Sequence, residues 1–165
     1  MIPLFKPYIP ELPEIDSILH SNALAYGNYT KQFEEKLKEY FDVPYLIVTN
    51  SFNTAIYVVL TTLGIVPGDG VIVSPMACLA STQPYLSGGL QVSWADVDPR
   101  TGTLLPESAK GQIMKNTKAI IHNHFCGYPG YIDEINAIGK NYGIPIIDDG
   151  IECLRERKLE VVEQI

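Results

Sequence analysis

Two adjacent carboxylates follow a short apolar run late in the sequence. Asp148 and Asp149 come directly after residues 144–147, whose sequence IPII is typical of a buried strand. An unpaired carboxylate at such a position is costly to desolvate, so we expect a cation or a hydrogen-bonded partner beside it. A protonated pyridine nitrogen of a cofactor is one such cation, and Asp149 would keep that ring charged. The alternative is a helix N-cap or a solvated loop carboxylate, because Asp is a preferred capping residue.

A second group of small polar side chains lies where an earlier apolar run meets a helical pattern. In VTNSFNTAI, residues 48–56, the natural ligands for a phosphate are Ser51, Asn53 and Thr54, together with backbone N–H groups of the helix start. Capping a helix requires the same residue types, so the spacing alone leaves a plain N-cap as the more common outcome.

Two histidines and a cysteine alternate in the segment HNHFC. In a strand, His122, His124 and Cys126 would share one face, and imidazole with thiolate suits zinc. A fourth ligand is not evident, and structural zinc sites have more specific spacing than this. We therefore expect satisfied polar groups at a strand end and no metal site.

Apolar runs and helical patterns alternate along most of the sequence, which predicts an α/β fold with a mostly parallel sheet flanked by helices. Two further helices, at residues 11–19 and 29–41, are expected to form an N-terminal arm. The second carries Phe33, Leu37 and Tyr40 or Phe41 at core spacing. The expected strands are residues 46–48, 71–73, 90–94, 118–121 and 144–147, and the expected helices between them are residues 53–63, 78–86, 106–114 and 131–142.

Composition excludes several classes of function. The 165 residues carry a net charge of -7 with scattered basic residues, which argues against nucleic acid as a partner. No apolar run approaches the length that spans a bilayer and no leader pattern opens the sequence, so we expect a cytoplasmic protein without a membrane partner. The three cysteines, Cys78, Cys126 and Cys153, have no paired spacing and are expected to be reduced thiols.

Five segments in colinear order resemble one known family. They are GNYTKQFEEKLKEYF, NSFNTAIYVVLTTLGIVPGDGVIV, DVDPRTGTL, KAIIHNHFCGYPGYIDEI and YGIPIIDDGIEC. In order and spacing they are similar to the DegT/DnrJ/EryC1/StrS sugar aminotransferases, over about residues 1–153. Members of that family have the aspartate-aminotransferase type of fold and use pyridoxal 5'-phosphate to move an amino group from glutamate to a keto sugar linked to a nucleotide. Such sugars feed polysaccharide or antibiotic synthesis.

The resemblance implies a division of the sequence and a fold. Residues 1–153 would form an N-terminal arm and the cofactor-binding portion of an incomplete large domain of a transferase that depends on pyridoxal phosphate. Residues 154–165, which are charged and differ in composition from the preceding segments, are expected to form a divergent helical tail. An incomplete sheet would leave an edge uncovered, so self-association is expected unless a partner covers it.

Individual positions carry over from the family motif. By resemblance, Asp149 matches the aspartate that pairs with the pyridine nitrogen, and Glu152 matches a Gln or Glu near the ring. Cys78 occupies the position at which the family generally has an aromatic residue stacked on the ring.

The phosphate-binding turn of the family carries over in the same way. Asn53 and Thr54 match this turn, although the family usually has Gly or Ala followed by Thr where this sequence has Phe52 and Asn53.

The Schiff-base lysine of the family lies downstream of the aspartate, and the sequence offers no match for it. The lysines that fall outside any matching motif are Lys110, Lys115, Lys118, Lys140 and Lys158. Because this chemistry begins with an imine on lysine, we expect an inactive N-terminal fragment, which a separate C-terminal half could complement. Two alternatives stay open. One is a non-catalytic sugar-nucleotide or phosphate-binding subunit that pairs with an intact paralogue, since family members are homodimers. The other is a relative of the sugar dehydratases, in which histidine replaces the lysine.

Overall fold

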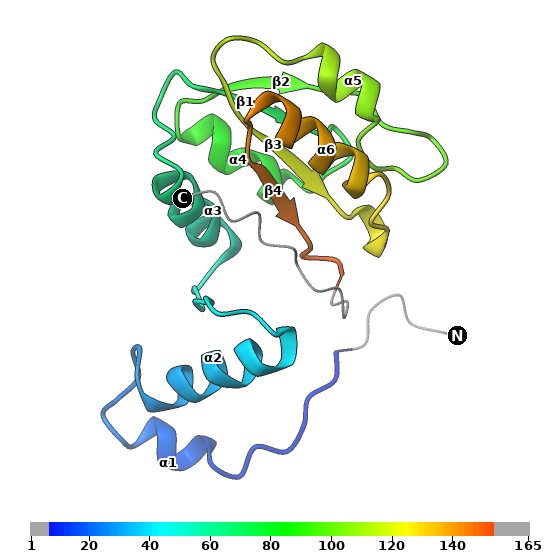
Figure 1. Cartoon of the computed structure of the whole chain (residues 1–165). Helices are drawn as coiled ribbons and strands as arrows, with labels where there is room; N and C mark the ends of the chain where they lie inside the picture. The colour runs from blue at the N-terminus through cyan, green and yellow to red at the C-terminus, as the bar shows by residue number, and fades with distance from the viewer. Residues whose placement is uncertain (1–6, 154–165) are drawn as a thin grey trace. The chain divides into compact units, whose positions relative to one another are not determined.

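The computed structural model describes residues 7–153, which fall into two compact units that meet between Val48 and Thr49 (Figure 1). The expected helical tail at residues 154–165 lies outside the described residues. Within the described ranges, no helix combines the length and the hydrophobicity needed to cross a membrane.

The N-terminal unit contains α1 (Ile15–Leu19) and α2 (Asn28–Phe41). The buried residue of α2 is Glu34, whose carboxylate accepts hydrogen bonds from the Tyr26 hydroxyl at 2.7 Å and the Val48 amide at 2.9 Å. These bonds lower the pKa of Glu34, the Tyr26 hydroxyl contributing most. Phe33 and Tyr40 are 52% and 56% exposed, so the predicted burial of Phe33 was wrong. The helical period was correct, and Leu37 and Phe41 of the predicted face are half-buried.

The strand expected at residues 46–48 is also absent, because this segment pairs with no strand among the described residues. The Val48 amide bonds to the Glu34 carboxylate instead, and Ile47 is 62% exposed. A short apolar run does not by itself specify a strand.

The second unit is built on a parallel four-stranded sheet. Its strands are β1 (Gly70–Val73), β2 (Gln91–Trp94), β3 (Thr117–Asn123) and β4 (Ile146–Asp149), in the order β2-β1-β3-β4. Every pairing is parallel. This architecture confirms the expected α/β class, and four of the five expected strands form within a few residues of their expected positions.

Helices cover both faces of this sheet, as its strand pattern requires (Figure 1). One face is covered by α3 (Phe52–Thr62) and α4 (Leu79–Ser87), and the other by α5 (Pro106–Gly111) and α6 (Ile132–Tyr142). Successive residues of a strand point to opposite faces. The α3/α4 face accordingly buries Ile56, Leu60, Val71, Val73, Tyr85, Ala119, Ile121 and Ile147, whereas the α5/α6 face buries Ile72, Ala109, Ile120, Ile135 and Ile138.

The strand order reverses between β1 and β3. The chain passes outward from β1 to β2 through α4, then returns through α5 to β3 on the other side of β1. The covering helices change faces at the same step. Open α/β sheets bind ligands outside the carboxyl ends of their strands at such a reversal. A site is therefore expected where β1, β3 and β4 end.

Gly130, in the turn between β3 and α6, provides a test of this packing. Its φ is +52°, and an added Cβ would overlap the buried side chain of Thr103. We expect Gly130→Ala to lower the free energy of unfolding by about 2–4 kcal/mol, from left-handed strain and overpacking together. Gly143 has a φ of +66° but no heavy atom within 4 Å of the added Cβ, so Gly143→Ala should cost only about 1 kcal/mol. Urea unfolding measures both values, and equal losses would contradict the overlap with Thr103.

Candidate functional site

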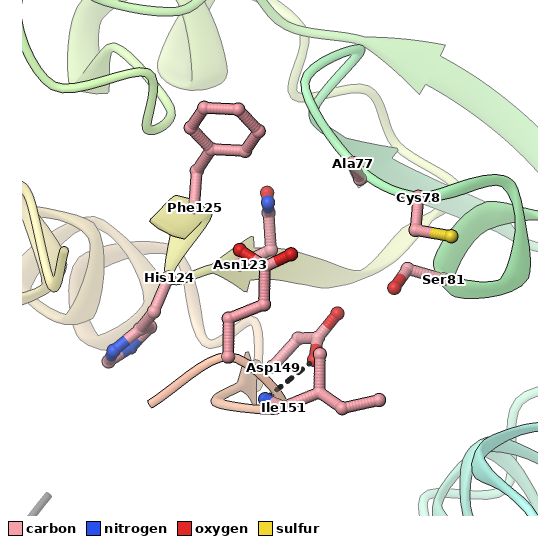
Figure 2. A pocket seen from close by; sticks show the side chains of 9 residues that line it. Ala77, Cys78, Ser81, Asn123, His124, Phe125, Asp149 and Ile151 are labelled. Atoms are coloured by element: carbon pink, nitrogen blue, oxygen red, sulfur yellow. Dashed lines mark hydrogen bonds between the residues drawn. The ribbon is translucent and has the colours of Figure 1, made fainter. Parts of the chain in front are cut away.

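An open pocket lies at the carboxyl ends of β3 and β4, beside the start of α4 (Figure 2). Its lining comes from four places: the loop after β1, the first turn of α4, the end of β3 and the end of β4. The lining residues are Ala77, Cys78, Ser81, Asn123, His124, Phe125, Asp149, Ile151 and Glu152. The pocket thus occupies the position at which the strand order predicts a ligand site.

Asp149 is the buried acid of this pocket. Its residue is 5% exposed, and Oδ1 accepts a hydrogen bond from the Ile151 amide at 3.2 Å. Oδ2 has no hydrogen-bond partner among the described residues. Burial raises the pKa of Asp149, and the charges of Asp148 and Glu152 add to this effect, while the Ile151 amide and the Ser81 hydroxyl oppose it. A positive group placed at Oδ2 would remove most of the cost of ionising this carboxyl.

Tyr85 of α4 lies near Asp149 but cannot neutralise its charge. Its ring is fully buried in the core of the α3/α4 face, and its hydroxyl has no partner among the described residues. Burial and the nearby charge of Asp149 raise the pKa of Tyr85 well above its ordinary value, so the phenol stays protonated and neutral.

Asn123 is a pocket residue that the sequence analysis missed. Its side chain is 7% exposed, and Nδ2 donates to the Met76 carbonyl at 2.8 Å. Oδ1 has no partner among the described residues. Asn123 pairs in register with Asp149, and both continue the series of residues that point to the α3/α4 face. The sequence carried a signal for this site. Asn123 follows Ile121 by two residues and Asp149 follows Ile147 by two residues, so each polar side chain lies on the same face as the isoleucine before it.

The His–Cys series occupies the same segment but does not converge. His122 is fully buried, its Nε2 donates to the Pro129 carbonyl at 2.8 Å, and burial lowers its pKa. His124 Nε2 lies 2.5 Å from Asp148 Oδ1, and Cys126 is exposed. No group of three or more acidic, His or Cys side chains in the described part of the chain is arranged to hold a metal ion.

Three of the residues expected at a cofactor site lie together in this pocket: Cys78, Asp149 and Glu152. Cys78 is exposed at the N-cap of α4 and makes no capping bond with its side chain. Glu152 Oε2 accepts a hydrogen bond from the Cys126 amide at 2.5 Å, which joins the segment after β4 to the loop after β3.

The other two expected residues, Asn53 and Thr54, lie at the start of α3 and do not line the pocket. Ser51 caps this helix, because its hydroxyl accepts from the Thr54 amide at 3.2 Å. The Thr54 hydroxyl donates to Asn50 Oδ1 at 2.9 Å. Phe52 packs against the core of the α3/α4 face, so its bulk occupies the core and not the space in front of the helix start.

A known family matches this sheet and its strand-end pocket. The DegT/DnrJ/EryC1/StrS aminotransferase family matches residues 10–155. The chain belongs to this family. Spore coat polysaccharide biosynthesis protein SpsC of Bacillus subtilis is 29% identical over 144 residues, which are 87% of this chain and 37% of SpsC.

Solved structures show the same fold. NtdA of Bacillus subtilis with bound cofactor PMP is 28% identical with a TM-score of 0.82, over 85% of this chain and 32% of NtdA. GDP-4-keto-6-deoxy-D-mannose-3-dehydratase of Escherichia coli with bound hydrated PLP is 29% identical with a TM-score of 0.79, over 89% of this chain and 40% of that enzyme. The chain therefore spans less than half the length of each of these three relatives.

The burial of Asp149 predicts an unusual dependence of stability on pH. Burial gives the Asp149 carboxyl a higher pKa in the folded chain than in the unfolded chain. At a pH above this raised pKa the carboxyl is ionised in both states, and only the folded chain bears the cost of desolvating the charge. As the pH falls through that pKa towards the unfolded value of about 3.9, the folded chain binds the proton first and becomes more stable relative to the unfolded chain. Asp149→Asn should therefore raise the free energy of unfolding at neutral pH, and this gain should shrink as the pH approaches about 4.

Urea unfolding across that pH range measures this effect, and the exposed Asp96 provides the matched control. Asp96→Asn should leave the stability and its pH dependence close to those of the parent chain. A loss of stability at neutral pH in Asp149→Asn would show that the apo chain already satisfies the carboxylate.

Proposed function

We propose that this chain provides the cofactor-facing wall of a pyridoxal-phosphate-dependent aminotransferase that acts on a nucleotide-linked keto sugar in polysaccharide biosynthesis. The observation that carries the proposal is the buried Oδ2 of Asp149, which has no hydrogen-bond partner among the described residues and belongs to a side chain that lines the strand-end pocket. Membership of the family and the relation to SpsC support it. When bound, pyridoxal phosphate supplies an electron sink for the carbanion formed during amino transfer.

The chemistry of the pocket fits this cofactor. Asp149 would hold a proton at the ring nitrogen, and its buried position strengthens the attraction to that positive group. Cys78 and Ser81 line the α4 side of the pocket and would border the ring there. Glu152, oriented by the Cys126 amide, would lie near the ring from the segment after β4.

The phosphate group is assigned to the start of α3. The first-turn N–H groups of a helix have no partners within the helix, and the positive end of the helix dipole favours an anion there. The Ser51 hydroxyl preserves this geometry by capping the helix at the Thr54 amide, and the Thr54 hydroxyl donates to Asn50 Oδ1. We place Asn53 and Thr54 against the phosphate, since Phe52 packs into the core and leaves the first turn accessible.

The chain by itself would bind the cofactor without a covalent bond. None of the lysines in the described part of the chain lines the pocket. Amino transfer would therefore require a group outside the described residues, and we infer that a complementing C-terminal half or the partner in a homodimer supplies it and recognises the nucleotide-linked sugar. Pairing with an intact paralogue would make the same chain a regulatory subunit.

Sugar dehydration is a second candidate function, favoured by the similarity to the E. coli dehydratase. The same carboxylate and the same helix start would hold the cofactor in either case. The two reactions differ in the residue that faces the reacting carbon of the cofactor, and no described lysine occupies the pocket to decide between them.

A titration with pyridoxal phosphate tests the proposal. Cofactor fluorescence should show saturable binding to the parent chain, and Asp149→Asn should bind at least about 30-fold more weakly, because removing one member of a buried charge pair costs about 2 kcal/mol or more. Asp96→Asn, which removes an exposed carboxylate, should bind like the parent chain.

Borohydride treatment of the complex, followed by mass spectrometry, tests the mode of binding. We expect no single lysine to retain the cofactor. A specific modified lysine would contradict the non-covalent mode, and equal binding by Asp149→Asn would contradict the role of Asp149. An absence of saturable binding would refute the proposal as a whole.

A further inference from the structure

The amide of Asn123 has only one orientation compatible with its surroundings. The Met76 carbonyl can only accept a hydrogen bond, so Nδ2 must face Met76, at 2.8 Å. Oδ1, at the other end of the amide, then points away from Met76. Asn123 lines the pocket and is only 7% exposed. Oδ1 has no partner among the described residues, and a buried acceptor without a donor is costly.

Asn123 is next to Asp149 in the sheet. The two residues are register partners at the ends of adjacent parallel strands, whose backbones lie about 4.8 Å apart, and both side chains line the same pocket (Figure 2). Each presents one buried oxygen without a partner. Together they specify a ligand with two donors on one edge: a positive N–H for the carboxylate, and a neutral O–H or N–H for the amide oxygen.

We propose that Asn123 Oδ1 accepts a hydrogen bond from the ring hydroxyl of the bound cofactor, and that it favours the neutral form of this hydroxyl over its phenolate. This inference rests on the proposed function, because pyridoxal phosphate has one ring hydroxyl, at position 3, two ring atoms from the nitrogen. An amide oxygen cannot donate to a phenolate, so the bound hydroxyl should lose its proton at a higher pH than it would without Asn123.

The same argument gives Asn123 a role distinct from that of Asp149. Asp149 would hold the ring through charge, which any protonated pyridine supplies. Asn123 would discriminate among pyridines by their hydroxyl, because a ligand without this group leaves Oδ1 without a donor.

Two ligands that cannot react with a lysine provide the test. The first is 4-deoxypyridoxine 5'-phosphate, which has the ring nitrogen, the 3-hydroxyl and the phosphate. The second is (4,6-dimethylpyridin-3-yl)methyl phosphate, which differs from the first only in lacking the hydroxyl. The parent chain should prefer the first, and Asn123→Ala should reduce this preference by about three- to ten-fold, the contribution of one hydrogen bond. If Asn123→Ala weakens the binding of both ligands by the same factor, the substitution has only damaged the pocket in general, and the inference is overturned.

The absorbance of bound 4-deoxypyridoxine 5'-phosphate gives a second readout, because ionisation of the 3-hydroxyl changes the ring spectrum. The ionisation midpoint should be at lower pH in Asn123→Ala than in the parent chain. If the variant does not fold, the parent chain alone decides the question. A bound hydroxyl that ionises at or below the pH observed for the free ligand would overturn the inference.

The failure of this inference is distinguishable from the failure of the proposed function. Binding of both ligands by the parent chain without preference would retain the cofactor pocket and overturn the role of Asn123, with water satisfying Oδ1. Binding of neither ligand would overturn both.

Discussion

The parallel pairing of β3 with β4 is the constraint on which the candidate site depends. Ile121 pairs with Ile147, and both side chains enter the core of the α3/α4 face. Two residues further along, Asn123 pairs with Asp149 on the same face, where the strands end and the pocket begins. A slip of one residue in either strand would turn its polar side chain to the α5/α6 face and expose apolar surface, so the core fixes the register of the site.

That core also supports an arrangement that is unfavourable in the apo chain. Asp149 and Asn123 each bury an oxygen without a partner, and the neutral phenol of Tyr85 lies in the core near the carboxylate. Buried polar groups of this kind persist only where the surrounding packing imposes them, and they are characteristic of functional sites. The apolar residues of two neighbouring strands and of α4 provide that packing, whereas the loop after β3 contributes the Cys126 amide that orients Glu152.

Local patterns in the sequence were sufficient for most of the fold and for part of the site. The alternation of apolar runs and helical segments predicted the parallel sheet. The position of Asp149 after an apolar run left two interpretations open, a partnered buried carboxylate and a capping or solvated one, and the structure has the residue buried. Predictions failed where a partner decides the structure: residues 46–48 found no strand to pair with, and Phe33 found no described surface to cover it. Asn123 was missed because its significance comes from its register with Asp149, which only the assembled sheet reveals.

The charges of the pocket explain why two separate parts of the chain would share one cofactor. The pocket lining includes the acidic side chains of Asp149 and Glu152 and neither lysine nor arginine, so it suits a cationic ring and disfavours a phosphate. The start of α3, which packs beside α4 on the same face, offers backbone N–H groups and a positive dipole end. A ligand with a positive ring and a negative phosphate matches this separation of charge, whereas an ordinary anionic ligand would match only one end of it.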